Sequence, residues 1–244
     1  IAGLSLSLLL SSAPAHAEAG FENWVAGFRK TAAQSGISGS TYDRAFRGVD
    51  AIDPEVLEKA RYQPEFTAPV WDYFDNRVHD NSVSVGRAMA KKWKPWLDKI
   101  EARYGVDRYI LLAIWSMESN YGEILKRPDV VKSTVRSLAT LAYADKRRAK
   151  FARTQLLASL KILQRGEIDE SNLVGSWAGA MGHTQWMPEV WLNVGMDYDK
   201  DGRVSPFGKP DDALGSSARY LLNRGKYHRG EHWGYEVNAS VAAS

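Results

Sequence analysis

Apolar side chains recur at helical spacing through most of this 244-residue chain, and this pattern limits the folds available to it. Phe21, Trp24, Val25 and Phe28 stand at positions i, i+3, i+4 and i+7, on one face of a helix. Caps, glycines and prolines predict further helices at residues 41–46, 54–60, 82–104 with a break near Pro95, 107–118, 133–144, 145–164 and 211–223, while residues 190–196 form a short apolar segment. Strand patterns are sparse, so the sequence predicts one mainly α domain.

The N-terminal segment has the pattern of an export signal. Residues 1–10 form an apolar run, and Ala15-His16-Ala17 is a small-x-small cleavage site before Glu18. The alternative is a membrane anchor, for which the run is short. We expect residues 1–17 to be part of a signal peptide that is removed, and no later segment is apolar enough to cross a membrane.

The amino-acid composition excludes some kinds of site and some cellular locations. There is no Cys, which excludes disulfides, thiolate metal sites and a lipid-modified cysteine after the signal. We therefore expect a soluble, monomeric protein of the bacterial periplasm. The net charge of +3 does not favour nucleic acid as a partner, although it suits an acidic polymer. The 9 Trp and 11 Tyr offer stacking surfaces for sugars, although most such residues are core.

A run of thirteen residues, 176–188, combines small residues with Trp, Met, a Gln and a Pro. Gly179, Gly182 and Pro188 disfavour a helix interior, so the backbone is shaped for close approach of something. One interpretation is a groove in which Gln185 hydrogen-bonds an N-acetyl or hydroxyl group. The other is a tight contact between helices followed by a turn, and the run alone does not decide between them.

Glu118 is the candidate catalytic acid. It lies in the last turn of the helix predicted at residues 107–118, which is apolar around most of its circumference and is expected to be buried. Trp115 and Met117 predict a raised pKa through desolvation, as a general acid at a glycosidic oxygen requires. The alternative is an ordinary exposed Glu at a helix end.

Two further charged groups invite a functional interpretation. Arg147 and Arg148 are either a solvated helix face or a clamp for carboxylates of a cell-wall glycan. Residues 197–205 match the first nine positions of a calcium loop, with Asp at positions 1, 3 and 5 and Gly at 6. The usual Glu at position 12 is absent, and Asp211 or Asp212 could replace it. The alternative is an Asp- and Gly-rich turn.

The ordered set of motifs resembles the lytic murein transglycosylase B family. Each motif is weak alone, but together they span nearly the whole chain after residue 17: Trp71-Asp72-Tyr73, residues 104–106 and 118–122, residues 137–143 with Arg147-Arg148, residues 175–188, and residues 197–220. Departures from the family pattern occur at His183-Thr184, at Trp186 and at Glu189-Val190. The resemblance implies a lysozyme-like α domain at residues 18–237, which we expect to continue further in the family, and leaves residues 238–244 as a tail.

The resemblance also implies an activity and a set of site residues. It implies cleavage of the MurNAc–GlcNAc bond in peptidoglycan glycan strands, with Glu118 as the single acid/base and a 1,6-anhydromuramyl product. It places Ser176, Gln185, Arg147, Arg148 and Tyr220 around the glycan. It implies a structural Ca²⁺ or Na⁺ held by Asp197, Asp199, Asp201, the Arg203 carbonyl and Asp212, and no cofactor for the chemistry. A hydrolytic lysozyme and a non-catalytic peptidoglycan-binding module remain the alternatives.

Overall fold

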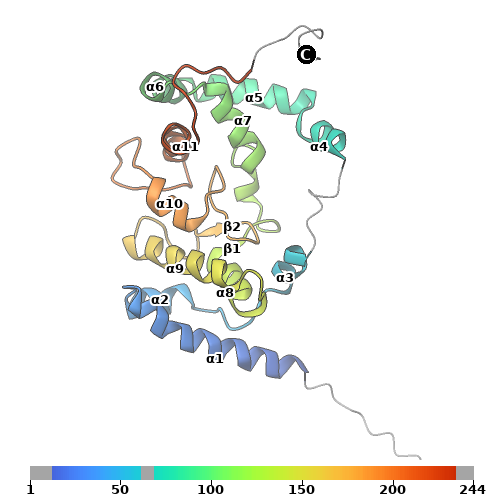
Figure 1. The fold of residues 1–244 in the computed structure, drawn as a ribbon, viewed down its shortest axis with the longest axis vertical. Coiled ribbons are helices and arrows are strands. Elements are labelled where there is room, and N and C mark those ends of the chain that lie inside the picture. Colours follow the sequence, from blue (N-terminus) through green and yellow to red (C-terminus); the bar gives the residue numbers. More distant parts are fainter. Residues whose placement is uncertain (1–12, 62–68, 235–244) are drawn as a thin grey trace, which may run out of the picture.

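One helix, α7, connects the two halves of the protein (Figure 1). The computed structural model describes residues 13–61 and 69–234, with side chains from residue 19 onward. The elements are α1 (Ala13–Gln34), α2 (Gly39–Ala45), α3 (Pro54–Arg61), α4 (Val70–Arg77), α5 (Asp80–Lys92), α6 (Lys94–Tyr104), α7 (Arg108–Ser119), the short 3₁₀ helix η2 (Glu123–Lys126), β1 (Lys132–Ser133), α8 (Thr134–Ala144), α9 (Ala149–Arg165), β2 (Val174–Gly175), α10 (Pro188–Val194) and α11 (Asp211–Asn223). The mainly α fold predicted from the sequence is therefore confirmed.

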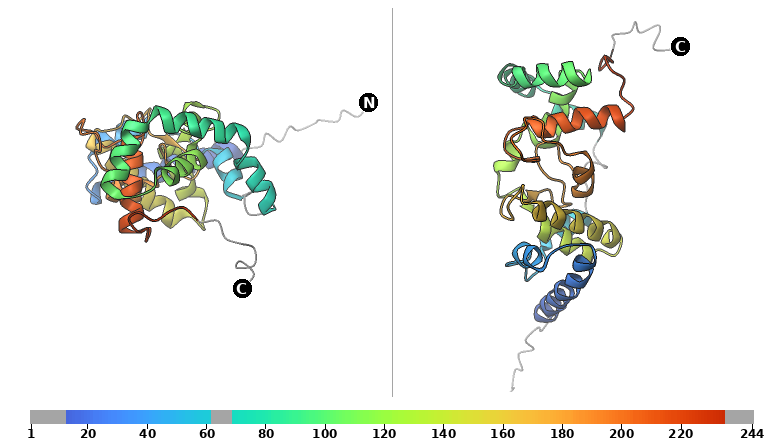
Figure 2. Two further views of the ribbon diagram at one scale, coloured as in Figure 1. Left: turned by 90° about the horizontal axis from the view of Figure 1, so that it is seen from above. Right: turned by 90° about the vertical axis from the view of Figure 1, so that its left-hand side faces the viewer.

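The protein has two main hydrophobic cores, and α7 belongs to the upper one. The lower core of Figure 1 joins α1, α2, α8, α9 and α10, with Phe21, Leu138, Leu156 and Trp191 fully buried in it. The upper core joins α6, α7 as far as Trp115, Tyr121 of the turn that follows, and α11. The side view in Figure 2 shows the same stacking along the long axis. Because α7 runs from the upper core toward the lower one, its C-terminal end lies at the junction between them.

Local sequence signals set the ends of most helices. Asp107 caps α7, since its Oδ1 accepts a hydrogen bond from the Tyr109 amide at 2.7 Å. Asp53 does the same for α3, accepting from the Glu55 amide at 3.0 Å. Helix α9 ends at Gly166 in the left-handed conformation that glycine adopts without strain.

The break expected near Pro95 is confirmed, whereas other details of the helices differ from the prediction. The stretch expected at residues 82–104 divides at Trp93 into α5, which already begins at Asp80, and α6, because Pro95 occupies the first turn of α6, where no amide donor is needed. Helix α4 was not predicted. Helix α9 begins at Ala149 rather than at Asp145. The Asp145 carboxylate instead accepts hydrogen bonds from the amides of Arg147 and Arg148, at 3.0 and 3.2 Å, and forms a turn.

The prediction that α7 is buried around most of its circumference is wrong. Leu111, Leu112 and Trp115 face the core, but Tyr109 is 62% exposed and Met117 is 41% exposed. These two line a cavity of about 510 Å³ between α7 and α5. The apolar residues on this side of α7 therefore form a surface depression and not core packing.

The only sheet is small in the described part of the chain. Strand β1 pairs antiparallel with β2, with Lys132 opposite Gly175 and Ser133 opposite Val174. This pairing fixes the start of the run 176–188 beside the first turn of α8.

The terminal predictions fall largely outside the described residues. The apolar run of the proposed signal peptide and the tail at residues 238–244 both lie outside them, while α1 begins at Ala13 and includes Ala15-His16-Ala17. Within residues 13–61 and 69–234, none of the helices has the length and hydropathy needed to cross a membrane.

Candidate active site at the end of helix α7

The chain turns sharply just after Glu118. Asn120, Tyr121 and Gly122 all have left-handed backbone angles, with φ of 48°, 58° and 85°. The Tyr121 amide donates to the Trp115 carbonyl at 3.2 Å, which satisfies one of the free carbonyls at the helix end. Asn tolerates this conformation better than most residues, so Asn120 suits the cap. As a result, Glu118 projects from the last turn of α7 at the junction of the two cores.

Glu118 is exposed at the surface, in agreement with the alternative of an exposed Glu at a helix end. The surrounding protein nevertheless desolvates its carboxyl in part and raises its pKa above the usual value for Glu, and the Arg77 guanidinium opposes this rise to a smaller extent. Arg77 is held nearby because its Nη1 donates to the Met117 carbonyl at 3.4 Å. Within the described residues, no hydrogen bond or ion pair engages the Glu118 carboxylate. Its proton is therefore available to a group that enters from solvent.

Two cavities flank the end of α7. The one already described, between α7 and α5, is lined by Arg77, Tyr109, Met117 and Tyr121 among others. The second, of about 490 Å³, lies on the other side and is lined by Gly122, η2, His183 and the loop after residue 203. Glu118 lines neither of them, and Met117 is the nearest residue in sequence that lines the first.

The run 176–188 forms a tight, irregular loop, and its glycines pack against the protein itself. A Cβ at Gly179 would lie 2.7 Å from the Leu138 side chain, and one at Gly182 would lie 2.5 Å from the Pro206 carbonyl oxygen. A Cβ at Gly175, just before the run, would meet the Ala180 carbonyl oxygen. The interpretation that these small residues open a groove for a ligand is therefore wrong. The predicted contact between helices is also absent here, because the neighbours are α8 and a loop.

The predicted glycan-binding residues of this loop have internal hydrogen bonds. The Ser176 Oγ accepts from the Ala180 amide at 3.1 Å and closes a turn. Gln185 has a left-handed φ of 49°, and its Nε2 donates to the Gly182 carbonyl at 2.9 Å. Its Oε1 has no hydrogen-bond partner among the described residues and can accept from a ligand.

The loop also contacts the other predicted binding residues. The Trp186 ring lies edge-on to Tyr220 of α11, with ring centroids 5.0 Å apart. The Arg148 guanidinium lies 5.7 Å from the centre of the Trp177 ring and forms an ion pair with Asp145 at 2.7 Å. Arg147 is different, because its side chain is 73% exposed. No hydrogen bond or ion pair joins Glu118 to any of these predicted residues within the described part of the chain.

Sequence reasoning missed His183, which connects this loop to α7. Only 6% of it is exposed. The Trp115 Nε1 donates to its Nδ1 at 3.0 Å, and the Ser119 Oγ donates to its backbone carbonyl at 2.6 Å. Trp115 and His183 are 68 positions apart, and a lone His offers no periodic signal, so the sequence alone did not indicate this contact.

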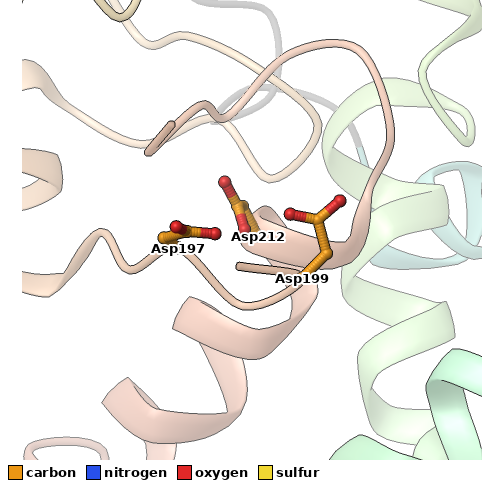
Figure 3. A group of neighbouring side chains, drawn as sticks. All are labelled: Asp197, Asp199 and Asp212. Carbon is orange, nitrogen blue, oxygen red and sulfur yellow. The ribbon is translucent and has the colours of Figure 1, made fainter. Parts of the chain in front are cut away.

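The predicted calcium loop gathers three carboxylates. Ligand oxygens of Asp197, Asp199 and Asp212 all lie within 4.8 Å of one another (Figure 3). Asp212 sits in the first turn of α11, so the structure selects it over Asp211 for the position that the missing Glu would occupy. Asp201 is outside this group, but it lines the same 190 Å³ cavity as Asp199, Arg203 and Asp212.

The donor set of this loop fits a hard divalent cation. Carboxylate oxygens are preferred by Ca²⁺, whereas the loop has no imidazole or thiolate that would favour zinc. Lys209 partly balances the charge through its ion pair with Asp199 at 3.3 Å. Burial raises the pKa of Asp212 to about 6. In addition, amides of the loop already point at these carboxylates, for instance Gly202 toward Asp197 at 2.9 Å, so the loop is preformed.

These features define a mainly helical protein that carries a partly desolvated carboxyl at the end of α7 and a separate Asp-rich loop before α11. A family model described as the transglycosylase SLT domain matches residues 20–244. The chain belongs to this family.

Three proteins are similar to this chain in sequence or in structure. The membrane-bound lytic murein transglycosylase B of Escherichia coli is 28% identical over 165 residues, which are 68% of this chain and 41% of that protein. SltB3 from Pseudomonas aeruginosa, solved in complex with NAG-anhNAM-pentapeptide, is 45% identical with a TM-score of 0.82, over 90% of this chain and 57% of that one.

The third relative is the Escherichia coli lytic transglycosylase Slt35, solved in complex with calcium. It is 24% identical with a TM-score of 0.71, over 87% of this chain and 65% of that one, and this likeness concerns the fold alone. The lysozyme-like fold expected from the sequence is thereby confirmed. The chain spans about two fifths of the first relative's length and somewhat more than half of the second's.

Proposed function

We propose that this protein is a lytic transglycosylase that cleaves the MurNAc–GlcNAc bond of peptidoglycan without water. The observation that carries the proposal is the Glu118 carboxyl, which has a raised pKa and no protein partner at the end of α7 among the described residues. Family membership and the muropeptide complex of SltB3 support the same substrate class.

A single carboxyl suffices for this chemistry. Protonated Glu118 gives its proton to the leaving O4 of GlcNAc as the bond from MurNAc C1 to that oxygen breaks. The resulting carboxylate then takes the proton of the MurNAc C6 hydroxyl as that oxygen bonds to C1. The products are a free GlcNAc hydroxyl and a 1,6-anhydromuramyl end, and Glu118 is protonated again. A hydrolase of this type normally needs a second carboxylate, and the motifs of the sequence offer only Glu118 as an obvious candidate.

The residues around the glycan are part of the proposal. Exposed Arg147 is suited to a stem-peptide carboxylate, and the free Oε1 of Gln185 to an N-acetyl N–H. Ser176 shapes the loop, Arg148 stacks on Trp177, and Tyr220 supports Trp186.

The Asp-rich loop is proposed to bind Ca²⁺, with Na⁺ as the alternative. Asp197, Asp199 and Asp212 would hold it, with Asp201 and the Arg203 carbonyl completing the oxygen set. A cation there would tie the segment after α10 to the start of α11, and no step of the chemistry uses it. The sequence supports a monomer in the periplasm, with a catalytic domain at residues 18–237 after a signal peptide.

Digestion of purified sacculi tests the proposal. Mass spectrometry of the soluble fragments should show anhydromuramyl ends, and the Glu118→Gln variant should form them at least about 100-fold more slowly. Reducing MurNAc ends would identify a hydrolase instead. Binding without fragments would identify a wall-binding module.

A further inference from the structure

His183 is a buried titratable group that the proposed chemistry does not use. It lies in the loop 176–188, and its ring packs edge-on to Trp115 with ring centroids 5.4 Å apart. A buried polar ring is costly unless both nitrogens are hydrogen-bonded, so its partners indicate what it does.

The hydrogen bonds of His183 fix one neutral tautomer. The Trp115 indole N–H can only donate, so the His183 Nδ1 at 3.0 Å must be the acceptor. The proton is then on Nε2, which donates to the Gly208 carbonyl at 2.8 Å. Burial lowers the pKa of His183, and this also favours the neutral ring. The ring thus bridges α7 and the loop that leads into α11.

Two hydrogen-bond partners of His183 lie on either side of Glu118 in the sequence. Trp115 lies three residues before Glu118, and Ser119, which donates to the His183 carbonyl, directly follows it. At Gly122 a Cβ would lie 2.5 Å from the His183 ring, so the sharp turn after α7 also rests on this side chain. On the opposite side, the His183 amide donates to the Pro206 carbonyl at 2.8 Å.

We propose that His183 is a positioning residue that holds the last turn of α7, and with it the Glu118 carboxyl, in the geometry for proton transfer. This inference rests on the proposed function. Glu118 has no hydrogen bond of its own among the described residues, so the placement of its carboxyl depends on the backbone that carries it. That backbone is tied on both sides of Glu118 to His183, and through His183 to the loop at residues 206–208.

Three variants separate this role from general stability. His183→Phe keeps an aromatic ring and removes both ring hydrogen bonds. His183→Gln keeps an acceptor and a donor at similar reach. Gln155→Leu is the matched control, because Gln155 is 2% exposed and also makes two side-chain hydrogen bonds, to Glu189. These bonds join α9 to α10 and do not involve α7.

We expect His183→Phe to lower kcat on the order of 10- to 100-fold with little change in KM, as a small misplacement of a catalytic group does. His183→Gln should recover most of the activity, and Gln155→Leu should keep kcat while lowering the melting temperature. The ¹H–¹⁵N resonance of the Trp115 indole should shift in the Phe variant and return toward the wild-type position in the Gln variant.

Other results would overturn the proposal. These are wild-type kcat in His183→Phe, equal loss in the Phe and Gln variants, or equal loss in Gln155→Leu. If the Phe variant does not fold, Trp115→Phe removes one of the ring hydrogen bonds and should give the same selective loss in kcat. Failure of the wild-type protein to form anhydromuramyl ends would contradict the proposed function, whereas the indole resonances still test the His183 contact.

Discussion

At the scale of single residues, Glu118 illustrates how the setting of a carboxyl changes its chemistry. Its place at the end of an apolar helix was visible in the sequence, and the direction of its pKa shift agrees with that prediction, although the residue itself is exposed. The role of Arg77 was not visible, because it comes from α4, 41 positions earlier, and depends on how α4 packs against α7. His183 was missed for the same reason. Residue chemistry can be inferred locally, whereas partners distant in sequence cannot.

The pH dependence of the activity follows from the protonation of Glu118. As a general acid it must carry its proton, so activity should fall as pH rises through its folded-state pKa, which lies above that of an ordinary Glu. Initial rates of anhydromuropeptide release across the pH range measure this. Arg77→Gln should move the fall to higher pH, because it removes the charge that lowers the pKa; an unchanged or lower midpoint would contradict this assignment.

The raised pKa of Glu118 also predicts that the protein loses stability as its carboxyl ionises. Between the ordinary pKa of Glu and the raised pKa in the fold, the folded state binds more protons than the unfolded state. Stability therefore falls as pH rises through this interval. Glu118→Gln does not titrate, so its melting temperature should exceed that of the wild type at neutral pH and match it more closely at acid pH. The prediction would be wrong if the difference in melting temperature, Glu118→Gln minus wild type, were smaller at neutral pH than at acid pH.

At the scale of elements, the helix ends marked by Asp107, Asp53 and Gly166 were predicted correctly, whereas α4 and the packing of the loop 176–188 were not. Asp107, Asp53 and Gly166 act within a few residues of themselves, so their caps can be inferred from the sequence. The glycines of the loop are instead required by packing against residues distant in sequence, such as Leu138 and Pro206. The sequence showed that the backbone is approached closely there, but not that the approaching group is the protein itself.

A pair of alanine substitutions measures this close packing. Gly182→Ala combines a left-handed φ of 75° with contact against Pro206, whereas Gly166→Ala has φ of 73° and no atom within 4 Å. The control should lose about 1–2 kcal/mol of unfolding free energy from backbone strain alone. Gly182→Ala should lose roughly a further 1–3 kcal/mol from overpacking. Chemical denaturation gives both values, and equal losses would show that the contact with Pro206 costs nothing.

At the scale of the whole molecule, α7 connects two cores, and the Asp-rich loop lies beside α11 of the upper one. The mainly α class followed from periodicity, but this arrangement depends on which helix faces meet, and the apolar exposure of Tyr109 and Met117 shows that periodicity alone misjudged one face. The calcium loop was predicted from its spacing, and the gathering of Asp197, Asp199 and Asp212 agrees with that prediction.

Removal of the cation should therefore lower global stability. With Ca²⁺ at about 100 times its Kd, binding to the folded state adds about 2.7 kcal/mol, or about 5–10 °C in melting temperature for a chain of this size. Calorimetry with Ca²⁺ and with a chelator measures the difference. Asp199→Asn keeps the acceptor for the Asp201 amide but removes a charge, and it should abolish most of the calcium-dependent shift. A chelator-insensitive wild type would exclude a stabilising cation at this loop.

The packing of Gly175, Gly179 and Gly182 has a consequence for how this family can diversify. At each of them a methyl group would meet atoms of a different neighbour, namely Ala180, Leu138 and Pro206. At Gly175 and Gly182 the opposing atoms include backbone of Ala180 and Pro206, which no change of side chain removes, whereas at Gly179 they belong to the Leu138 side chain alone. In a library of all single substitutions scored for folded protein, the three glycines should therefore be intolerant, while Glu118 should accept replacements. Gly179 should regain some tolerance in libraries that also vary Leu138, and Gly175 should not regain it in any library of side chains.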